Sequence, residues 1–178
     1  MENGLVHIYC GEGKGKTTAA VGLAIRAAGA GWKVCFGQLM KAGNSSELSV
    51  LKNIEGLEVK TVVNHFGFTR NMTDEDKREL TRLHNEFIKE MRVALEKGTY
   101  QMIVLDEILS AYQYGLLEQE QLLELLDTNK REGGKAELIL TGRNPAEALI
   151  QRADYITEMK GIRHPYEKGV AARMGIEW

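Results

Sequence analysis

The residues best suited to chemistry lie near the start of the chain, in the glycine-rich segment Gly11-Glu12-Gly13-Lys14-Gly15-Lys16-Thr17-Thr18. An apolar run over residues 5–9 precedes this segment, and small apolar residues from 19 to 30 follow it. A strand, a glycine-rich turn and Gly-Lys-Thr at a helix start predict a phosphate-binding loop. The glycines let backbone amides face an anion, and the helix adds unpaired amides and the positive end of its dipole. Lys16 would reach phosphate oxygens, and the Thr17 hydroxyl would hold Mg²⁺.

One position departs from the strict spacing of such loops. The pattern of glycine, four residues and Gly-Lys-Thr requires glycine at position 10, where this chain has Cys10. We expect the small side chain to be tolerated, because position 10 lies at the end of the strand rather than in the tight part of the loop. The alternative is a glycine-rich turn that binds no ligand. The order of strand, loop, lysine, two threonines and helix disfavours it.

Two carboxylates, Asp106 and Glu107, end an apolar strand predicted over residues 100–107. A doubly charged end on such a strand costs free energy unless a cation or a hydrogen-bond donor lies nearby. The second magnesium-organising strand of phosphate-loop proteins has this pattern. The sequence therefore favours metal-site carboxylates over an ordinary strand exit.

Other polar residues also fall at strand ends. Gln38 and Lys41 end the second predicted strand, and Arg143 follows the fifth. Ligands of open α/β sheets lie outside the carboxyl ends of the strands, so all three are candidate ligand contacts. A solvated Lys41 and a surface Arg143 beside a helix cap remain the alternatives. Arg26, inside the first helix, is open between a ligand contact and a surface salt bridge.

An aromatic loop follows the third predicted strand and contains His65, Phe66 and Phe68. A flat apolar ligand could rest on this loop, since it lies just past a strand end. The alternative, which composition alone favours, is that both phenylalanines pack into the edge of the core.

Hydrophobic patterning predicts the elements that must position these residues. Strands are expected over 5–9, 33–40, 57–63, 100–107, 135–140 and 154–159, and helices over 17–30, 47–53, 73–97 and 116–131, with a further helix start at 144–147. Strands that alternate with helices and are apolar enough to be covered on both faces indicate a mostly parallel sheet. The expected fold is α/β, a P-loop NTPase-like three-layer sandwich, with residues 1–178 as a single domain.

Composition restricts the setting in which the protein works. The net charge of the 178-residue chain is −2, so no basic field recruits nucleic acid. Cys10 and Cys35 are the only cysteines, and we expect reduced structural thiols in a cytoplasmic protein. The N-terminus enters the first strand without an export signal. No apolar run reaches about 18 residues, so no contact with a membrane is expected.

Several of these motifs together resemble the ATP:co(I)rrinoid adenosyltransferases of the phosphate-loop type. The resemblance is carried by residues 11–20, Gln38-Leu39-Met40-Lys41, Gly67-Phe68-Thr69, Val104-Leu105-Asp106-Glu107, Thr141-Gly142-Arg143 and the ending from Arg163 to Glu177. It covers almost the whole chain. Only the loop is specific by itself, but its Gly-Lys-Gly-Lys-Thr-Thr form together with the ending is hard to match elsewhere.

The resemblance implies that cobalt in the +1 state of a reduced corrinoid attacks the 5′-carbon of ATP and expels triphosphate. The loop would then hold a leaving group, and no base that activates water is needed. Family members also work as homodimers, take electrons from a reduced flavoprotein and use Mg²⁺ or Mn²⁺.

The same resemblance implies roles for individual residues. Lys16 and Arg143 would bind phosphates. Contacts that fix the nucleotide would come from Glu12, Thr18 and Arg26. The metal would be organised by Thr17, Asp106 and Glu107. Phe68 would press on the corrin and help to displace its lower axial ligand, which completes a catalytic set of Lys16, Thr17, Phe68 and Glu107.

Two departures from the family pattern affect the corrinoid site. Arg70 stands where familiar members have tryptophan, so Phe66 or His65 is a candidate to share the displacement role. Those members also have a helix ahead of the first strand that caps the corrinoid, and this sequence starts directly at the strand. Two rival functions use the same residues: a phosphate-loop ATPase or small-molecule kinase, and a nucleotide sensor whose aromatic loop binds a protein.

Overall fold

The structure is a computed structural model that describes residues 4–63, 65–67, 69–131 and 133–177. Within these residues six strands form one sheet in the order β3-β2-β4-β5-β1-β6, and every neighbouring pair is parallel. The strands are β1 (Val6–Cys10), β2 (Val34–Gln38), β3 (Leu57–Thr61), β4 (Met102–Asp106), β5 (Glu137–Thr141) and β6 (Tyr155–Glu158). Because all strands run the same way, their carboxyl ends meet at one edge of the sheet.

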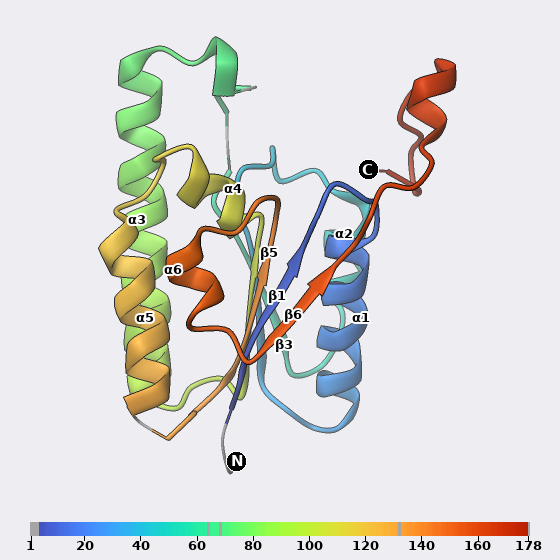
Figure 1. Ribbon diagram of the computed structural model, residues 1–178. Coiled ribbons are helices and arrows are strands. Elements are labelled where there is room, and N and C mark those ends of the chain that lie inside the picture. Colours follow the sequence, from blue (N-terminus) through green and yellow to red (C-terminus); the bar gives the residue numbers. More distant parts are fainter. Residues whose placement is uncertain (1–3, 64, 68, 132, 178) are drawn as a thin grey trace.

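Helices cover both faces of the sheet, as Figure 1 shows. One face is covered by α1 (Lys16–Gly29) and α2 (Ser46–Leu51). The other face is covered by α3 (Asp74–Glu96), α4 (Ile108–Gln113), α5 (Gln119–Arg131) and α6 (Glu147–Ile150). Two short 3-10 helices, η1 (Thr69–Asn71) and η2 (Pro165–Lys168), lie outside these layers. The predicted three-layer α/β sandwich is confirmed.

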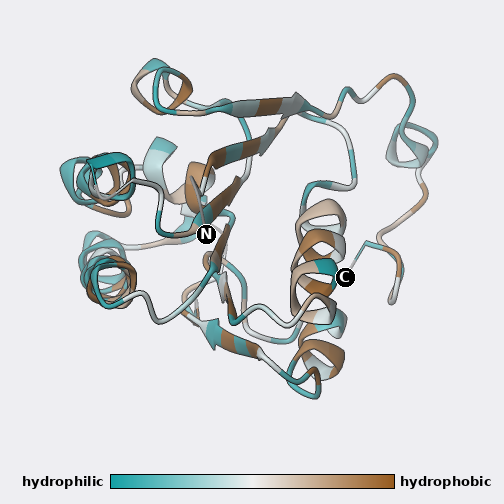
Figure 2. Cartoon of the chain, turned by 90° about the horizontal axis from the view of Figure 1, so that it is seen from below, coloured by the Kyte–Doolittle hydropathy of each residue, from teal (hydrophilic) through white to brown (hydrophobic). Residues whose placement is uncertain are grey.

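The strand residues alternate between two hydrophobic clusters, one in each layer. In β4, Met102 and Val104 pack with α1 and α2, whereas Ile103 and Leu105 pack with α3, α4 and α5. Successive strand side chains point to opposite faces, so a strand covered on both faces must be apolar throughout. Figure 2 shows the hydrophobic colour concentrated on the strands between the helical layers.

The sequence pattern and the structure differ in two places. The predicted helix over 116–131 begins only at Gln119, and the six-residue α4 before it was not predicted. A helix this short carries too little periodicity to be recognised. The last strand, β6, was expected to be covered on both faces, but its four residues are all exposed. It is an edge strand of the sheet and pairs with β1.

Beyond β6 the chain leaves the sheet beside the loop between β1 and α1 and projects away from the body (Figure 1). Exposed apolar side chains in this segment include Ile162, Tyr166 and Met174. In the part of the chain that the structure describes, no helix combines the length and apolar character needed to cross a bilayer.

Candidate active site

The predicted phosphate-binding loop connects β1 to α1 at the carboxyl edge of the sheet. Gly11 and Gly15 have φ values of 102° and 109°, which L side chains rarely adopt. Close approach of β6 also requires glycine: a Cβ at Gly13 would lie 2.6 Å from the carbonyl oxygen of Met159. The amide of Gly13 donates to that oxygen at 2.6 Å. The end of β6 therefore holds the loop in place, a contact that the sequence did not predict.

The amino end of α1 supplies the anion-binding groups expected of the loop. The first hydrogen bond of the helical pattern runs from the amide of Ala19 to the carbonyl oxygen of Gly15. The amides of Lys16, Thr17 and Thr18 precede it and so have no acceptor within the helix. Together with the helix dipole, they make this end of α1 suitable for an anion.

The Lys16 side chain crosses the loop and is buried. Its ammonium group donates to the carbonyl oxygens of Gly11 and Gly13, each at 2.7 Å. Burial, and secondarily the positive charge of Arg143, lowers the pKa of Lys16 below its usual range. An anion bound in the loop would favour the charged form of this lysine and reverse that effect.

Asp106 is the hub of the carboxyl edge and is fully buried. Its Oδ1 accepts from the hydroxyls of Thr17 at 2.9 Å and Thr141 at 2.7 Å. Its Oδ2 accepts from the ammonium of Lys41 at 2.9 Å and from Gln38 Nε2 at 3.4 Å. Strand β5 separates β1 from β4, so Thr141 lies between the loop and the carboxylate. The structure thus brings three predicted site residues, Thr17, Gln38 and Lys41, to a fourth, Asp106, and adds Thr141.

Gln38 and Lys41 are linked further to α2. Gln38 Nε2 also donates to Glu47 Oε1 at 3.2 Å, and Lys41 Nζ lies 3.8 Å from the same oxygen. The hydroxyl of Ser45 donates to Gln38 Oε1 at 3.1 Å. Gln38 is therefore a buried connector between Asp106 and Glu47, and Lys41 is the cation of the network.

Glu107, the second predicted carboxylate, joins the network through its backbone amide, while its side chain bonds to α4. Its φ is 63°, a left-handed conformation that is uncommon for a residue with a side chain. Its amide donates to the Thr141 hydroxyl at 2.9 Å, and its carboxylate accepts from Ser110 at 2.6 Å. Met40 and Asn144, after β2 and β5, also have positive φ values, 60° and 44°. Non-glycine residues with such angles cluster at functional sites, and all of those described here lie at the carboxyl edge.

Arg143 lies near the tip of the loop, where its guanidinium is 2.7 Å from the Glu12 carboxylate. The two side chains are 58% and 59% exposed. An ion pair this exposed contributes little to stability, so both groups are accessible to a ligand. Lys14 and Thr18 are exposed on the same loop.

A groove of about 790 Å³ adjoins the network. Its walls come from the loop after β2 and from η1, α3 and α4 with its flanking residues. The lining residues are Met40, Lys41, Thr69, Arg70, Lys77, Glu107, Ser110 and Tyr114. Lys41 and Glu107 belong to this wall and also to the network at the strand ends. The groove therefore opens directly onto the predicted phosphate and metal residues.

Arg26 is not brought to the phosphate loop of its own chain. It lies in the last turn of α1 and lines a cavity of about 250 Å³ with Trp32, Met102 and Glu137. Met102 and Glu137 are the first residues of β4 and β5, so this cavity is at the opposite edge of the sheet. The rise of α1 carries Arg26 away from the loop, about 1.5 Å for each residue.

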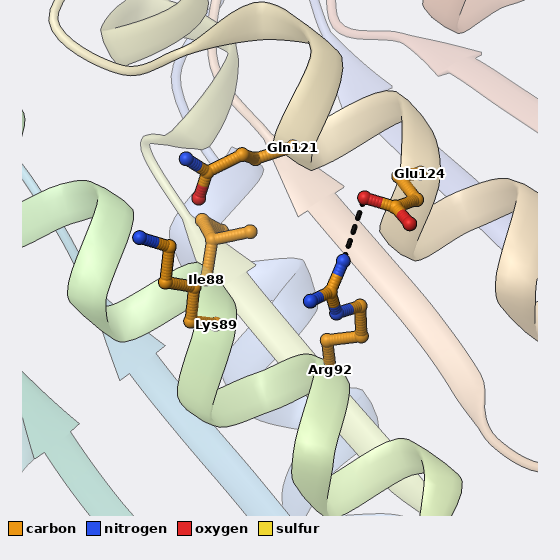
Figure 3. Close-up of a pocket in the computed structure, with 5 residues that line it drawn as sticks. All are labelled: Ile88, Lys89, Arg92, Gln121 and Glu124. Carbon is orange, nitrogen blue, oxygen red and sulfur yellow. Dashed lines mark hydrogen bonds and ion pairs between the residues drawn. The ribbon is translucent and has the colours of Figure 1, made fainter.

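Another cavity, of about 230 Å³, lies between α3 and α5 (Figure 3). Arg92 on α3 and Glu124 on α5 form an ion pair of 2.6 Å at its side. This face of the sheet is opposite α1 (Figure 1). The cavity is therefore a feature of helix packing and not part of the site.

Both cysteines are free and buried, which agrees with the prediction of reduced structural thiols. Cys10 is the last residue of β1 and pairs with Glu158 of β6. Its position at the strand end explains why the loop accepts cysteine in place of glycine. Burial raises the pKa of Cys35 to about 12, so this thiol is protonated and unreactive at neutral pH.

The aromatic loop is described only in part, because Phe68 lies outside the described residues. Phe66 is partly buried against the main hydrophobic cluster and lines a separate cavity with Glu79 and Arg82. This placement agrees with the core-edge alternative for Phe66. Arg70, which replaces the expected tryptophan, lines the groove beside Glu107.

The donor atoms at the strand ends suit a hard divalent cation. The Asp106 carboxylate and the Thr17 hydroxyl are in direct contact, and both are oxygen ligands of the kind that Mg²⁺ prefers. The described residues contain no group of three or more His, Cys, Asp or Glu side chains that could hold a metal. A cation here would therefore take its other ligands from phosphate oxygens and water.

The model of the family "ATP:corrinoid adenosyltransferase BtuR/CobO/CobP" matches residues 2–178. The chain belongs to this family. Similar curated proteins include the corrinoid adenosyltransferase of Escherichia coli strain K12, 28% identical over 99% of this chain and 87% of the relative. The corrinoid adenosyltransferase CobA of Salmonella typhimurium is 30% identical over 99% and 87% of the two chains. That of Pseudomonas aeruginosa is 30% identical over 99% and 85%.

Solved structures support the fold of this family member. The cytoplasmic domain of EssC superposes with a TM-score of 0.56 at 20% identity, over 96% of this chain and 34% of the other. EssC (ATPases 2 and 3) from Geobacillus thermodenitrificans gives a TM-score of 0.53 at 12% identity, over 98% and 35%. This chain spans about a third of those proteins. At such identities the likeness concerns the fold alone.

Sequence reasoning missed some residues of the network. Thr141 was part of the family pattern without a role, and Ser110 and Glu47 were not singled out. A hydroxyl residue at the carboxyl end of a buried strand, such as Thr141, could have been predicted as a site residue, because ligands of α/β sheets bind at that edge. Ser110 and Glu47 carried no comparable signal, since neither of them ends a predicted buried strand.

Proposed function

We propose that this protein transfers the 5′-deoxyadenosyl group of ATP to the cobalt of a reduced corrinoid and releases triphosphate. The observation that carries the proposal is that Lys41 and Glu107 belong both to the network at the strand ends and to the wall of the 790 Å³ groove. A nucleotide in the loop and a second, large substrate in the groove would therefore be neighbours. Family membership agrees with this pair of substrates.

The loop would bind the triphosphate of ATP. The free amides of α1, the ammonium of Lys16 and the exposed Arg143 all belong to the loop or contact it: Lys16 donates to Gly11, and Arg143 pairs with Glu12. Donors fixed in advance stabilise a leaving group at no cost of reorganisation when its charge develops. Glu12 would give up Arg143 to the phosphates, which is inexpensive because that ion pair is exposed.

Thr17 and Asp106 would hold Mg²⁺ or Mn²⁺, with Glu107 beside them. When bound, such a cation neutralises the developing charge of the leaving phosphate oxygens. Thr141 would keep the Asp106 carboxylate in orientation, because its hydroxyl donates to Oδ1 and accepts from the amide of Glu107. Gln38 would restrain the other carboxylate oxygen.

The groove would receive the corrinoid, whose cobalt is the nucleophile. Met40 and Tyr114 offer apolar surface, and Arg70 and Lys77 offer positive charge to polar side groups of the substrate. Phe68, which precedes η1, would press on the corrin. The electron pair of Co(I) forms the cobalt–carbon bond while the C5′–O bond breaks, and the pair from that bond leaves with the triphosphate. No proton is transferred, so the side chains need only bind, orient and exclude water.

Further parts of the proposal concern the setting of the enzyme. We propose residues 1–178 as one domain that acts as a homodimer, and the exposed edge strand β6, with Tyr155 and Ile156, supports an interface. A reduced flavoprotein would supply the electron that converts Co(II) to Co(I). The buried free thiols Cys10 and Cys35 support a cytoplasmic location.

Product analysis tests the proposal. The protein would be incubated with ATP, Mg²⁺ and chemically reduced Co(I) cobalamin, and the products separated in the dark. The expected products are a light-sensitive alkylcobalamin and inorganic triphosphate in equal amounts. ADP with unchanged cobalamin would overturn the proposal and favour a kinase or ATPase, whereas no turnover would favour a nucleotide sensor.

A further inference from the structure

The charge of Asp106 is balanced by one neighbour. The carboxylate is fully buried, and among the described residues Lys41 is the only cationic group within ion-pair distance of it. Thr17, Thr141 and Gln38 satisfy its remaining hydrogen bonds but carry no charge. A buried carboxylate is costly without a cation, so the folded chain depends on Lys41 to neutralise Asp106.

The Lys41 ammonium touches the same atoms that the proposed divalent cation would use. It lies 2.9 Å from Asp106 Oδ2 and 3.4 Å from the hydroxyl oxygen of Thr17. A phosphate-loop cation is held by the loop hydroxyl and by the strand-end aspartate. Two cations cannot occupy this position together, because they would repel at contact distance. Lys41 and a divalent cation must therefore exclude each other.

Lys41 also has a second acceptor within reach. Its ammonium is 3.8 Å from Glu47 Oε1, at the start of α2, and its side chain is 29% exposed on the groove wall. A lysine has a long flexible stem, so a small rotation transfers the ammonium between the two carboxylates. Gln38 Nε2 contacts both Asp106 and Glu47 and keeps them close together.

We infer that Lys41 is an exchangeable counter-ion, which neutralises Asp106 until a divalent cation takes over the carboxylate and then pairs with Glu47. The inference rests on the metal role proposed above for Asp106 and Thr17. It makes Lys41 a positioning residue that regulates metal entry and that remains at the boundary between the loop and the groove.

Manganese titration of the full-length protein without nucleotide, followed by the electron paramagnetic resonance of free Mn²⁺, tests the exchange. Lys41→Met should bind Mn²⁺ about ten-fold more tightly than the wild type. This factor is expected if the Lys41–Asp106 pair is formed in about nine-tenths of the wild-type molecules, because only the remaining tenth can then accept the cation. Lys60→Met is the matched control. Lys60 is 23% exposed and pairs with Glu58 and Glu90, so its loss should leave Mn²⁺ affinity unchanged.

Asp106→Asn separates failure of the inference from failure of the metal proposal. If Asp106→Asn abolishes Mn²⁺ binding but Lys41→Met leaves the affinity unchanged or weaker, the exchange is wrong and the metal site stands. If wild type and Asp106→Asn bind Mn²⁺ equally, the metal proposal fails and the inference fails with it.

Glu47→Gln tests the second position of the ammonium. In the wild-type background this change should weaken Mn²⁺ binding several-fold, because the displaced lysine loses its acceptor. In the Lys41→Met background it should have no further effect, and the double-mutant cycle isolates the coupling. Equal effects of Glu47→Gln in both backgrounds would contradict the transfer to Glu47.

A measurement on the wild type does not depend on the folding of any variant. The lysines can be labelled with an amine-specific reagent, with and without Mg²⁺, and quantified by mass spectrometry. We expect Lys41 to react faster with Mg²⁺ present, while Lys60 reacts at a constant rate as an internal reference. An unchanged rate for Lys41 in a protein saturated with the cation would overturn the exchange.

Discussion

Thr17 and Asp106 are 89 positions apart in the sequence, yet the Thr17 hydroxyl donates to Asp106 Oδ1 at 2.9 Å. The contact joins the start of α1 to the end of β4, although β5 lies between β4 and β1 in the sheet. It is possible because the first turn of α1 lies at the carboxyl edge of the sheet, where Thr141 of β5 donates to the same carboxylate oxygen. The phosphate loop and the carboxylate hub therefore form one site.

Lys16→Ala should abolish turnover and weaken ATP binding. Loss of one charge-assisted contact to phosphate costs roughly 1.5–3 kcal/mol, or about 10- to 150-fold in affinity. Calorimetric titration with ATP and Mg²⁺ measures the loss. Lys14→Ala, on the exposed side of the same loop, should have a smaller effect. Undiminished activity of Lys16→Ala would contradict the assignment of the loop.

Thr141→Val should destabilise the fold and reduce turnover together. The change keeps the shape of the side chain but leaves the buried Asp106 Oδ1 with one donor fewer and the amide of Glu107 without its acceptor. Such a loss costs about 1–3 kcal/mol, which urea denaturation would measure. A Thr141→Ser variant keeps the hydroxyl and should retain most of the stability. Equal losses in the two variants would show that packing of the methyl group matters instead.

Arg143→Ala should weaken ATP binding with little change in stability. Its ion pair with Glu12 is exposed, and such pairs are worth about 0–1 kcal/mol. Affinity for ATP should fall about ten-fold or more, since a contact with phosphate is worth at least about 1.5 kcal/mol. Glu12→Gln is the companion variant, because it breaks the same pair while keeping Arg143. Matching losses of affinity in both variants would mean that the pair itself is required.

His84 should make the stability of the protein depend on pH. Its ring is fully buried, Nδ1 lies 2.7 Å from the carbonyl of Leu116, and Nε2 has no hydrogen-bond partner among the described residues. Burial lowers the pKa of His84 below its usual range. The unfolded chain therefore binds this proton more readily, and the stabilisation is complete above the unfolded pKa of about 6.5 and decreases as the pH falls below it.

The His84 effect can be measured by urea unfolding at a series of pH values. Below about pH 6.5 the free energy of unfolding should fall more steeply in the wild type than in His84→Gln. The difference should be up to about 1.4 kcal/mol for each pH unit, until the pKa of His84 in the folded state is reached. His65→Gln, at an exposed position, should keep the wild-type slope. Identical slopes in the wild type and His84→Gln would show that other groups cause the loss of stability at acidic pH.

Phe68→Ala should slow the reaction from Co(II) cobalamin far more than the reaction from chemically reduced Co(I). The reason is the displacement role implied by the family resemblance: loss of the lower axial ligand makes Co(II) easier to reduce, and a substrate that is already Co(I) does not need it. Rates with both substrates, measured by the absorbance of the alkylated product, give the comparison. Equal losses would argue against displacement by this residue.

Much of the fold followed from local pattern. The capping box at Thr73, whose hydroxyl accepts from Asp76 while Asp76 accepts from Thr73, is a short-range signal, and α3 begins at Asp74 as expected. The boundaries of α4 and the exposure of β6 could not be predicted in this way. Both depend on where a segment lies in the sheet, which a window of neighbouring residues does not contain.

The sequence by itself determined the phosphate loop, the alternation of strands and helices and the pair of carboxylates, because each is a contiguous pattern with its own local physics. Tertiary structure decided which of those residues meet. The positions of β5 and β2 on either side of β4 brought Thr141 and Lys41 to Asp106, and the length of α1 took Arg26 to the opposite edge. Such outcomes depend on strand order and helix direction, which are set by packing of the whole chain.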